Sequence, residues 1–331
     1  MPKIVANFNI GLPGLCIVSL PEVEEISIKC TIADFEVNVD LHSDSFFQSG
    51  EDDGKYWTYA FNRAVVRVIR DEKDAPPLKE EGKLLQSQYL SQRSGEYGEA
   101  AREALNRIIK FFKYKLRNPF LQEFQPGHRS FADGYAKWSE LSGNILGEAI
   151  RTFVYERVPG ESGELSVKKL RPELISDLQA AMEEPIEPTL TEQILSDAQT
   201  AIFKKNFRRA VIELAIACEI SVKRSFFSLD SPAGAAFDYL EDRSKVKVTV
   251  IEMIHKVALE AFGVSFKKDH PKQHECIDHL FRCRNKVAHR GELILRDDQD
   301  LKKTVDYELI SEWWEAVNIL LEWLKVQTGN L

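Results

Sequence analysis

The period of the hydrophobic pattern changes along this chain, and that change restricts the folds it can adopt. Residues 1–75 contain β-branched and aromatic runs that alternate with polar residues, such as KIVANFNI and FEVNVDL. Clusters of Pro, Gly and Asp separate the runs, which is typical of strands joined by turns. From about residue 97, apolar residues instead recur every three or four positions, as on one face of an amphipathic helix. The sequence therefore predicts an α+β protein with a β-rich part followed by helices.

Breaks in composition divide the chain into three predicted regions. Residues 1–75 form a β-rich N-terminal domain, and the charged, proline-containing segment 71–83 is a linker. Residues 84–160 form a helical middle region, with one helix over YGEAAREALNRIIKFFKYKL and a second over GYAKWSELSGNILGEAIRTFVYERV. The face expected to be buried in the first helix comprises Ala101, Leu105, Ile108, Ile109 and Phe112.

Residues 185–331 form a predicted all-helical domain. It starts at Thr189, which forms a capping-box pattern with Glu192 directly after Pro188. Helices are expected at about 190–204, 207–227, 246–262, 271–289 and 306–326, with a turn at Asn206. A chain of 331 residues is long enough for two or three domains of ordinary size.

Composition points to a globular protein of a reducing compartment. The chain is 44% hydrophobic and 29% charged, and its five cysteines include no CxxC pair. No apolar run approaches the roughly 18 residues that a membrane-spanning helix needs. We therefore expect a cytoplasmic protein that does not contact a membrane. The net charge of −8 means that any nucleic acid must bind to a local basic patch.

The helix predicted over 271–289 carries an arginine on its apolar face. That face comprises Ile277, Leu280, Phe281, Arg284, Val287 and Ala288. His289 follows at the end of the helix, where Gly291 can adopt the left-handed conformation that terminates it. Arg284 is either half of a buried ion pair or part of a functional site.

This stretch resembles the motif of the higher-eukaryote and prokaryote nucleotide-binding (HEPN) domains. In that family a helix ends with Arg, a polar residue that is often Asn, three further residues and His. Here the motif is Arg284, Asn285, the segment 286–288 and His289, with Arg290 and Gly291 following. The upstream segment KKNFRRAVIELAIACEISVKRSFF resembles the family's helical pair. The resemblance covers the C-terminal part of the chain, implies a helical bundle there, and does not reach residues 1–160.

The resemblance implies a metal-independent endoribonuclease that acts as a homodimer. Many members cleave RNA with paired motifs across a basic cleft, and bacterial examples include toxins and phage-defence effectors. Cleavage by the 2′-hydroxyl needs a base, an acid and a cation. His289 can serve as acid or base, Arg284 can hold phosphate oxygens, and Asn285 can orient either group. We expect no metal and no cofactor. The alternative is a non-catalytic module that binds nucleotide or RNA, or docks a partner protein.

Local charge also favours an anionic partner. In residues 201–230 six basic residues accompany three acidic ones, and in residues 264–290 seven accompany three. Either window can also be an ordinary solvated face. The predicted substrate-binding residues are Lys286, Arg290, Arg208 and Arg209. Glu213 and Glu219 are predicted to support Arg284 by pairing with it, although a purely structural ion pair is equally compatible with either.

Other sequence patterns give weaker indications of function than the motif at 284–289. His270 and His274, like His279 and Cys283, are four residues apart, a spacing that two zinc ligands on one helix can use. Proline at 271 places His270 at or before the helix start, and no second compact ligand pair occurs. A phosphate-binding GxxxxGK[ST] loop is absent from the sequence. A third possibility is modification of Tyr307 by a nucleotidyltransferase. We expect the N-terminal domain to sense or position a ligand.

Overall fold

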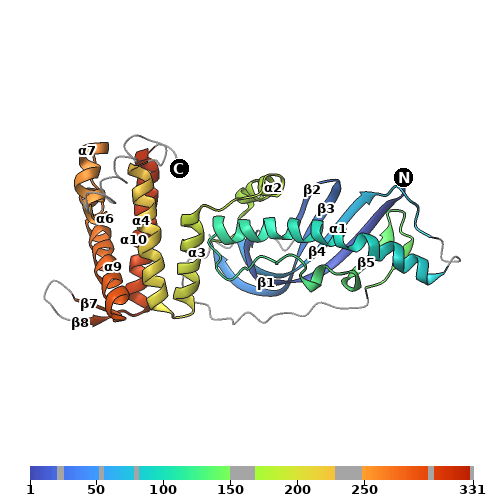
Figure 1. The fold of residues 1–331 in the computed structure, drawn as a ribbon, viewed down its shortest axis with the longest axis horizontal. Helices are drawn as coiled ribbons and strands as arrows, with labels where there is room; N and C mark the ends of the chain where they lie inside the picture. Colours follow the sequence, from blue (N-terminus) through green and yellow to red (C-terminus); the bar gives the residue numbers. More distant parts are fainter. Residues whose placement is uncertain are drawn as a thin grey trace. The chain divides into compact units, whose positions relative to one another are not determined.

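The computed structural model describes residues 1–20, 26–51, 56–77, 82–149, 168–227, 248–296 and 302–328. The chain forms two compact units, Met1–Glu187 and Pro188–Leu331 (Figure 1). The first is built on an antiparallel sheet and the second is mainly helical, so the α+β prediction is confirmed. In the described residues, no helix combines the length and the apolar character that crossing a membrane requires.

The first unit contains one antiparallel sheet in the strand order β2-β3-β4-β1-β5-β6. The strands are β1 (Lys3–Leu20), β2 (Ile26–Ile32), β3 (Phe35–Glu51), β4 (Tyr56–Asp71), β5 (Ala136–Glu140) and β6 (Ile145–Gly147). The runs KIVANFNI and LCIVSL belong to the same strand, because β1 continues through an irregularity between Gly11 and Cys16. The strands predicted in residues 1–75 are therefore confirmed.

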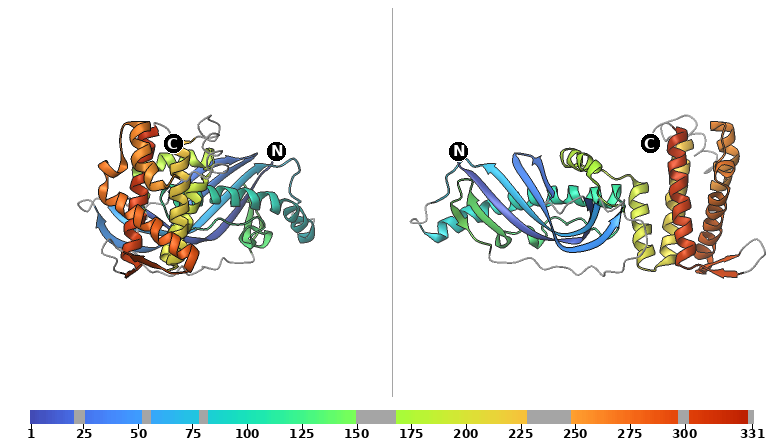
Figure 2. Two further views of the ribbon diagram at one scale, coloured as in Figure 1. Left: turned by 60° about the vertical axis from the view of Figure 1, so that its left-hand side comes forward. Right: turned by 180° about the vertical axis from the view of Figure 1, so that it is seen from behind.

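The helix α1 (Lys83–Lys110) covers one face of this sheet. It lies along the inner side of the curved strands and continues into the π-helical turn η2 (Phe111–Lys115) (Figures 1 and 2). The predicted buried face of the helix is buried as expected. Gly98 allows close packing here, because a Cβ at this position would lie 2.2 Å from the carbonyl oxygen of Phe131.

The predicted boundary between residues 1–75 and residues 84–160 is wrong, because the two regions share one core. The buried cluster combines β1 to β4 with α1, β5 and α2 (Ile175–Glu183). A sheet with one apolar face needs a cover, and α1 and α2 supply it. The described part of the unit also contains the short 3-10 helices η3 (Arg129–Phe131), η4 (Asp133–Tyr135) and η5 (Pro172–Leu174).

The second helix predicted for the middle region is also wrong where it can be compared. Residues of that segment form β5 and β6, and β5 pairs with β1. Ala136 and Trp138 are buried while Lys137 is exposed, which is the two-residue period of a strand. The remainder of the predicted helix, residues 150–158, lies outside the described residues.

A buried carboxylate directly after β4 ties α1 to the sheet. Oε1 of Glu72 accepts hydrogen bonds from Arg70 Nη2 at 2.8 Å and from Tyr97 Oη at 3.0 Å. Oε2 of Glu72 accepts from Arg93 Nε at 2.9 Å. Burial alone would raise the pKa of Glu72, but the hydrogen bonds from Arg70, Arg93 and Tyr97 outweigh it and lower that pKa. Arg93 and Tyr97 belong to α1, so the network fixes the helix against the strand.

The second unit contains the predicted helices and one short hairpin. The helices are α3 (Leu190–Phe203), α4 (Phe207–Phe226), α6 (Val250–Glu252), α7 (Ala258–Phe262), α8 (Phe266–Asp269), α9 (Pro271–Arg290) and α10 (Tyr307–Thr328). The π-helical turn η6 (Met253–Val257) joins α6 to α7. The hairpin of β7 (Ile294–Arg296) and β8 (Lys302–Thr304) departs from the all-helical prediction.

The helix starts in this unit follow the capping signals in the sequence. Thr189 Oγ1 accepts a hydrogen bond from the backbone N–H of Glu192 at 3.2 Å, and Glu192 Oε2 accepts from that of Thr189 at 2.8 Å. This is the predicted capping box. Asn206 caps α4 by accepting from the backbone N–H of Arg209. The buried face of α4 packs against α3, α9 and α10, which places this helix at the centre of the bundle.

Candidate functional site at the end of α9

The predicted motif occupies the last two turns of α9. The helix ends at Arg290, and Gly291 takes the left-handed conformation with φ of 67°, as expected from the sequence. His289 and Arg290 are exposed in the last turn. Cations at this position are stabilised by the negative end of the helix dipole. The helix therefore presents His289 to solvent.

The buried face of α9 differs from the predicted one. It comprises His274, Ile277, Leu280, Cys283 and Val287. Phe281 and Arg284 are only half-buried, and Ala288 is exposed. Arg284 thus lies on the flank of the buried face and not in the core. A buried partner is unnecessary for it, because its guanidinium reaches solvent.

Arg284 contacts its neighbour in the motif. Its Nη1 donates a hydrogen bond to Oδ1 of Asn285 at 3.1 Å, and the orienting role of Asn285 stays a prediction. The predicted pairing of Arg284 with Glu213 or Glu219 is not formed among the described residues. Each glutamate instead binds a basic residue of its own helix: Glu213 accepts from Arg209 Nε at 2.6 Å, and Glu219 lies 3.2 Å from Lys223.

Glu213 is partly buried on α4. Its Oε2 is buried and has no hydrogen-bond partner within the described residues. Burial raises the pKa of Glu213, although the hydrogen bond from Arg209 opposes the shift. Glu213 therefore belongs to the support of Arg209 at the start of α4.

The predicted substrate-binding residues lie at one end of the helical unit. The start of α4, with exposed Arg208 and Arg209, lies at the same end as the last turn of α9 and the β7–β8 hairpin (Figures 1 and 2). Lys286 is half-buried and Arg290 is exposed. Arg209 is partly neutralised, because it pairs with Glu213 and lies 3.7 Å from Asp197.

Two basic residues at this end were missed by the sequence reasoning. Lys302 and Lys303 are exposed on β8, next to the strand that follows α9. Their signal in the sequence was the Lys-Lys pair just before the last helix, which gave no hint of a hairpin. Together with the cations of α4 and α9, they add basic residues to this end of the bundle, where the acidic residues Glu292 and Asp306 are also exposed.

Arg284 and His289 start from different sides of α9. Five residues of an α-helix advance about 7.5 Å and turn about 140° beyond one full turn. The two side chains therefore leave α9 on different sides.

The zinc pattern is not assembled as the spacing suggested. His274 is buried against His255, with ring centroids 6.1 Å apart, and His255 Nδ1 lies 2.8 Å from Ser265 Oγ. Burial lowers the pKa of His274, and the charges of Lys267 and His255 lower it further. Within the described ranges, no group of three or more His, Cys, Asp or Glu side chains is arranged to hold a metal ion. Tyr307 is half-buried at the start of α10, and its modification stays a prediction.

Comparison with known proteins assigns no family to this chain. A scan against protein-family models finds no match, and searches of curated proteins and of solved structures find no match either. We therefore infer the function from the residues of the chain itself.

Proposed function

We propose that the unit Pro188–Leu331 is a metal-independent endoribonuclease of the HEPN type that acts as a homodimer. The observation that carries the proposal is the placement of Arg284, Asn285 and His289 in the last two turns of α9, at the end of the bundle where the start of α4 also lies. The exposed His289 supports a role in proton transfer, and the half-buried Arg284 supports a role in binding phosphate.

In the proposed reaction the 2′-oxygen of one nucleotide attacks the adjacent phosphorus. A bond forms between the 2′-oxygen and phosphorus, and the bond from phosphorus to the 5′-oxygen of the next nucleotide breaks. One His289 takes the proton of the 2′-hydroxyl, and a second His289 gives a proton to the leaving 5′-oxygen. The products are a 2′,3′-cyclic phosphate and a 5′-hydroxyl end.

Arg284 stabilises the charge that develops on the phosphate oxygens. A guanidinium has five N–H donors, and one of those of Arg284 binds Asn285 Oδ1. That bond leaves the other donors for the phosphate. Lys286, Arg290 and Arg208 would bind neighbouring phosphates along the strand.

Two arguments, one from the chemistry and one from the geometry of α9, support a dimer. The reaction needs an acid and a base, and the motif supplies one histidine per chain. Arg284 and His289 also leave α9 about 140° apart, and in the proposed dimer Arg284 of one chain would act together with His289 of the other. The half-buried Phe281 and exposed Ala288, on the same flank as Arg284, are available for that contact.

The test is RNA cleavage in the presence of EDTA. We expect the protein to cleave single-stranded or structured RNA with the chelator present, and we expect His289→Ala to lower the rate by about 10²- to 10⁴-fold. His279→Gln is the matched control, because it removes a histidine from the same helix outside the motif. Equal rates for the wild type and His289→Ala would contradict the proposal.

The second candidate is a non-catalytic module that binds nucleotide or RNA, or docks a partner. It is favoured by the separation of Arg284 and His289 around α9 in a single chain. Retention of RNA without cleavage, together with no growth defect when the protein is produced in cells, would support this module. A growth defect abolished by His289→Ala would instead support a nuclease. A role as a toxin or phage-defence effector rests on family analogy alone.

A further inference from the structure

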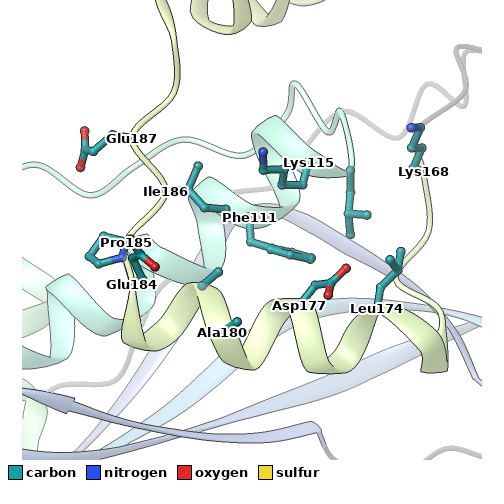
Figure 3. A pocket seen from close by; sticks show the side chains of 12 residues that line it. Phe111, Lys115, Lys168, Leu174, Asp177, Ala180, Glu184, Pro185, Ile186 and Glu187 are labelled. Atoms are coloured by element: carbon teal, nitrogen blue, oxygen red, sulfur yellow. The ribbon is translucent and has the colours of Figure 1, made fainter. Parts of the chain in front are cut away.

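The cavity between η2 and α2 of the first unit has a lining of mixed chemistry (Figure 3). Its charged side chains are three carboxylates and two lysines: Asp177, Glu184, Glu187, Lys115 and Lys168. The ring of Phe111, which also lines the cavity, is only 3% exposed. These groups favour no single class of ligand. His274 in the second unit, in contrast, is a buried titratable group with one defined set of neighbours.

His274 lies where α9 meets the segment 250–262, which comprises α6, η6 and α7. The residue is 8% exposed, and its ring lies against the ring of His255 on η6, with centroids 6.1 Å apart and ring planes at 80°. Nε2 of His274 is buried and has no hydrogen-bond partner within the described residues. Protonation would make both ring nitrogens donors. A charged N–H would then be buried without an acceptor, which costs free energy.

The groups that act on His274 come from α6, η6, α8 and α9. Burial has the largest effect and lowers the pKa of His274, and Lys267 of α8 and His255 of η6 lower it further. Asp278, on the same helix, and a hydrogen bond to the backbone of Ile251 on α6 favour the protonated ring. Burial and the two basic residues outweigh them, so the contact favours the neutral form of His274.

The carboxylates of these elements are weak counter-charges for a protonated His274. Three of them already bind another residue: Asp278 binds Arg282, Glu252 binds Thr249, and Asp269 binds Trp323. Each of these contacts uses part of the charge that the carboxylate could offer to the imidazolium. A proton on His274 would therefore gain little from them.

His255 differs from His274 because its partner can adapt to either protonation state. Nδ1 of His255 lies 2.8 Å from Oγ of Ser265, a residue that is 1% exposed. A hydroxyl group both donates and accepts, so Ser265 can bind the neutral and the protonated form of His255. Acid can therefore leave the contact of His255 with Ser265 in place while it disturbs His274.

We propose that the contact between α9 and the segment 250–262 is a pH-sensitive attachment, which opens when His274 is protonated. The helix α8 stays in place, because Trp323 of α10 donates to Asp269 at 2.9 Å and packs on Phe266, with ring centroids 5.5 Å apart. The attachment is complete above the ordinary histidine pKa of about 6.5, and it weakens as the pH falls from that value through the lower folded pKa. The proposal concerns packing and does not depend on the ribonuclease activity.

Amide hydrogen exchange of the full chain at about pH 7.5 and about pH 5 tests this attachment. Each exchange rate is divided by that of an unfolded peptide at the same pH, so the intrinsic effect of pH cancels. In acid we expect the amides of residues 254–262 to lose protection by at least about fivefold, and those of α10 by less than about twofold. No loss at residues 254–262, or an equal loss in α10, would overturn the proposal.

Variants assign the loss of protection to His274. His274→Phe keeps an aromatic ring and His274→Gln keeps a polar side chain, and neither takes up a proton in this pH range. In either variant, protection at residues 254–262 should change by less than about twofold between the two pH values. His279→Gln is the matched control, because His279 is half-buried on the same helix, and it should keep the acid response of the wild type. A wild-type response in both His274 variants would overturn the assignment, as would loss of the response in His279→Gln.

Discussion

Replacing Glu72 with glutamine should destabilise the first unit more than any change at a neighbouring exposed carboxylate. Arg70 makes the comparison possible, because it binds two carboxylates of different exposure. The side chain of Glu72 is 7% exposed, whereas that of Glu96, 2.6 Å from Arg70 Nη1, is 63% exposed. Each of Glu72→Gln and Glu96→Gln therefore removes one carboxylate charge that pairs with Arg70. The first carboxylate is buried and the second is exposed.

The expected magnitude follows from what each carboxylate binds. Glutamine at position 72 would present an NH₂ group to the N–H groups of either Arg93 or Arg70, and it would leave both guanidinium groups without their buried counter-charge. Breaking a buried ion pair from one side costs about 3–5 kcal/mol, whereas an exposed pair contributes about 0–1 kcal/mol. We take about 3 kcal/mol for Glu72→Gln, because both arginines keep some contact with solvent.

Differential scanning calorimetry of the full chain measures this difference. In a unit of this size, about 3 kcal/mol lowers the melting temperature by about 6–12 °C, and the change at Glu96 should lower it by no more than about 2–4 °C. Only the transition of the first unit should move. If Glu72→Gln shifts the melting temperature no more than Glu96→Gln does, the network does not fix α1 to the sheet.

The loss of stability caused by Glu72→Gln should also depend on pH. The pKa of Glu72 is lowered in the folded protein, so its stabilising effect is complete above the ordinary glutamate pKa of about 4.3. It is lost as the pH falls from that value through the lower folded pKa. The difference in stability between the wild type and Glu72→Gln should therefore be constant near neutrality and shrink in acid. A difference that grows in acid would contradict the assignment.

Two further predictions concern packing and thiol reactivity. In urea unfolding, Gly98→Ala should lower the free energy of unfolding by at least about 2 kcal/mol, because the new Cβ meets the Phe131 carbonyl. Gly95→Ala lies in open space on the same helix and should raise it by about 0.5–1 kcal/mol. Equal effects of the two changes would show that α1 does not pack this closely. Iodoacetamide should modify half-buried Cys276 well before fully buried Cys218, followed by mass spectrometry, although burial raises the pKa of both thiols; faster labelling of Cys218 would contradict the packing of α4.

Strands and helices with a clear hydrophobic period in their own sequence could be predicted. The strands of residues 1–75 and the five helices of the second unit appear where alternation and helical spacing placed them. The error at residues 136–147 has a tertiary cause. A short segment rich in helix formers becomes a strand there, because pairing with β1 buries Ala136 and Trp138.

The division of the first unit could not be predicted from composition alone. The charged linker at 71–83 looked like a domain boundary, but Glu72 within it is buried and binds α1. A charged residue in a linker and a charged residue in a buried network look alike in a sequence. Only the folded chain shows that the partners of Glu72 are Arg93 and Tyr97 on α1.

The predicted position of Arg284 on the buried face of α9 was not correct, because Arg284 lies at the edge of that face. The spacing placed it on the apolar face, but Cys283 is the buried residue at that level. Which flank is covered depends on α4 and α10, which pack against α9, and not on the sequence of α9 itself.

The central position of β1 has a consequence for how the chain folds during synthesis. Ile4 pairs with Arg70 of β4 on one side and with Glu140 of β5 on the other. Both edges of β1 therefore stay unpaired until these later strands have been synthesised. At about 5–20 residues per second, the ribosome needs roughly 7–27 seconds to add the 136 residues from Ile4 to Glu140. During that time an apolar strand with an open edge can pair with other chains. Production of the intact protein should therefore depend on protecting this strand until β5 has been made.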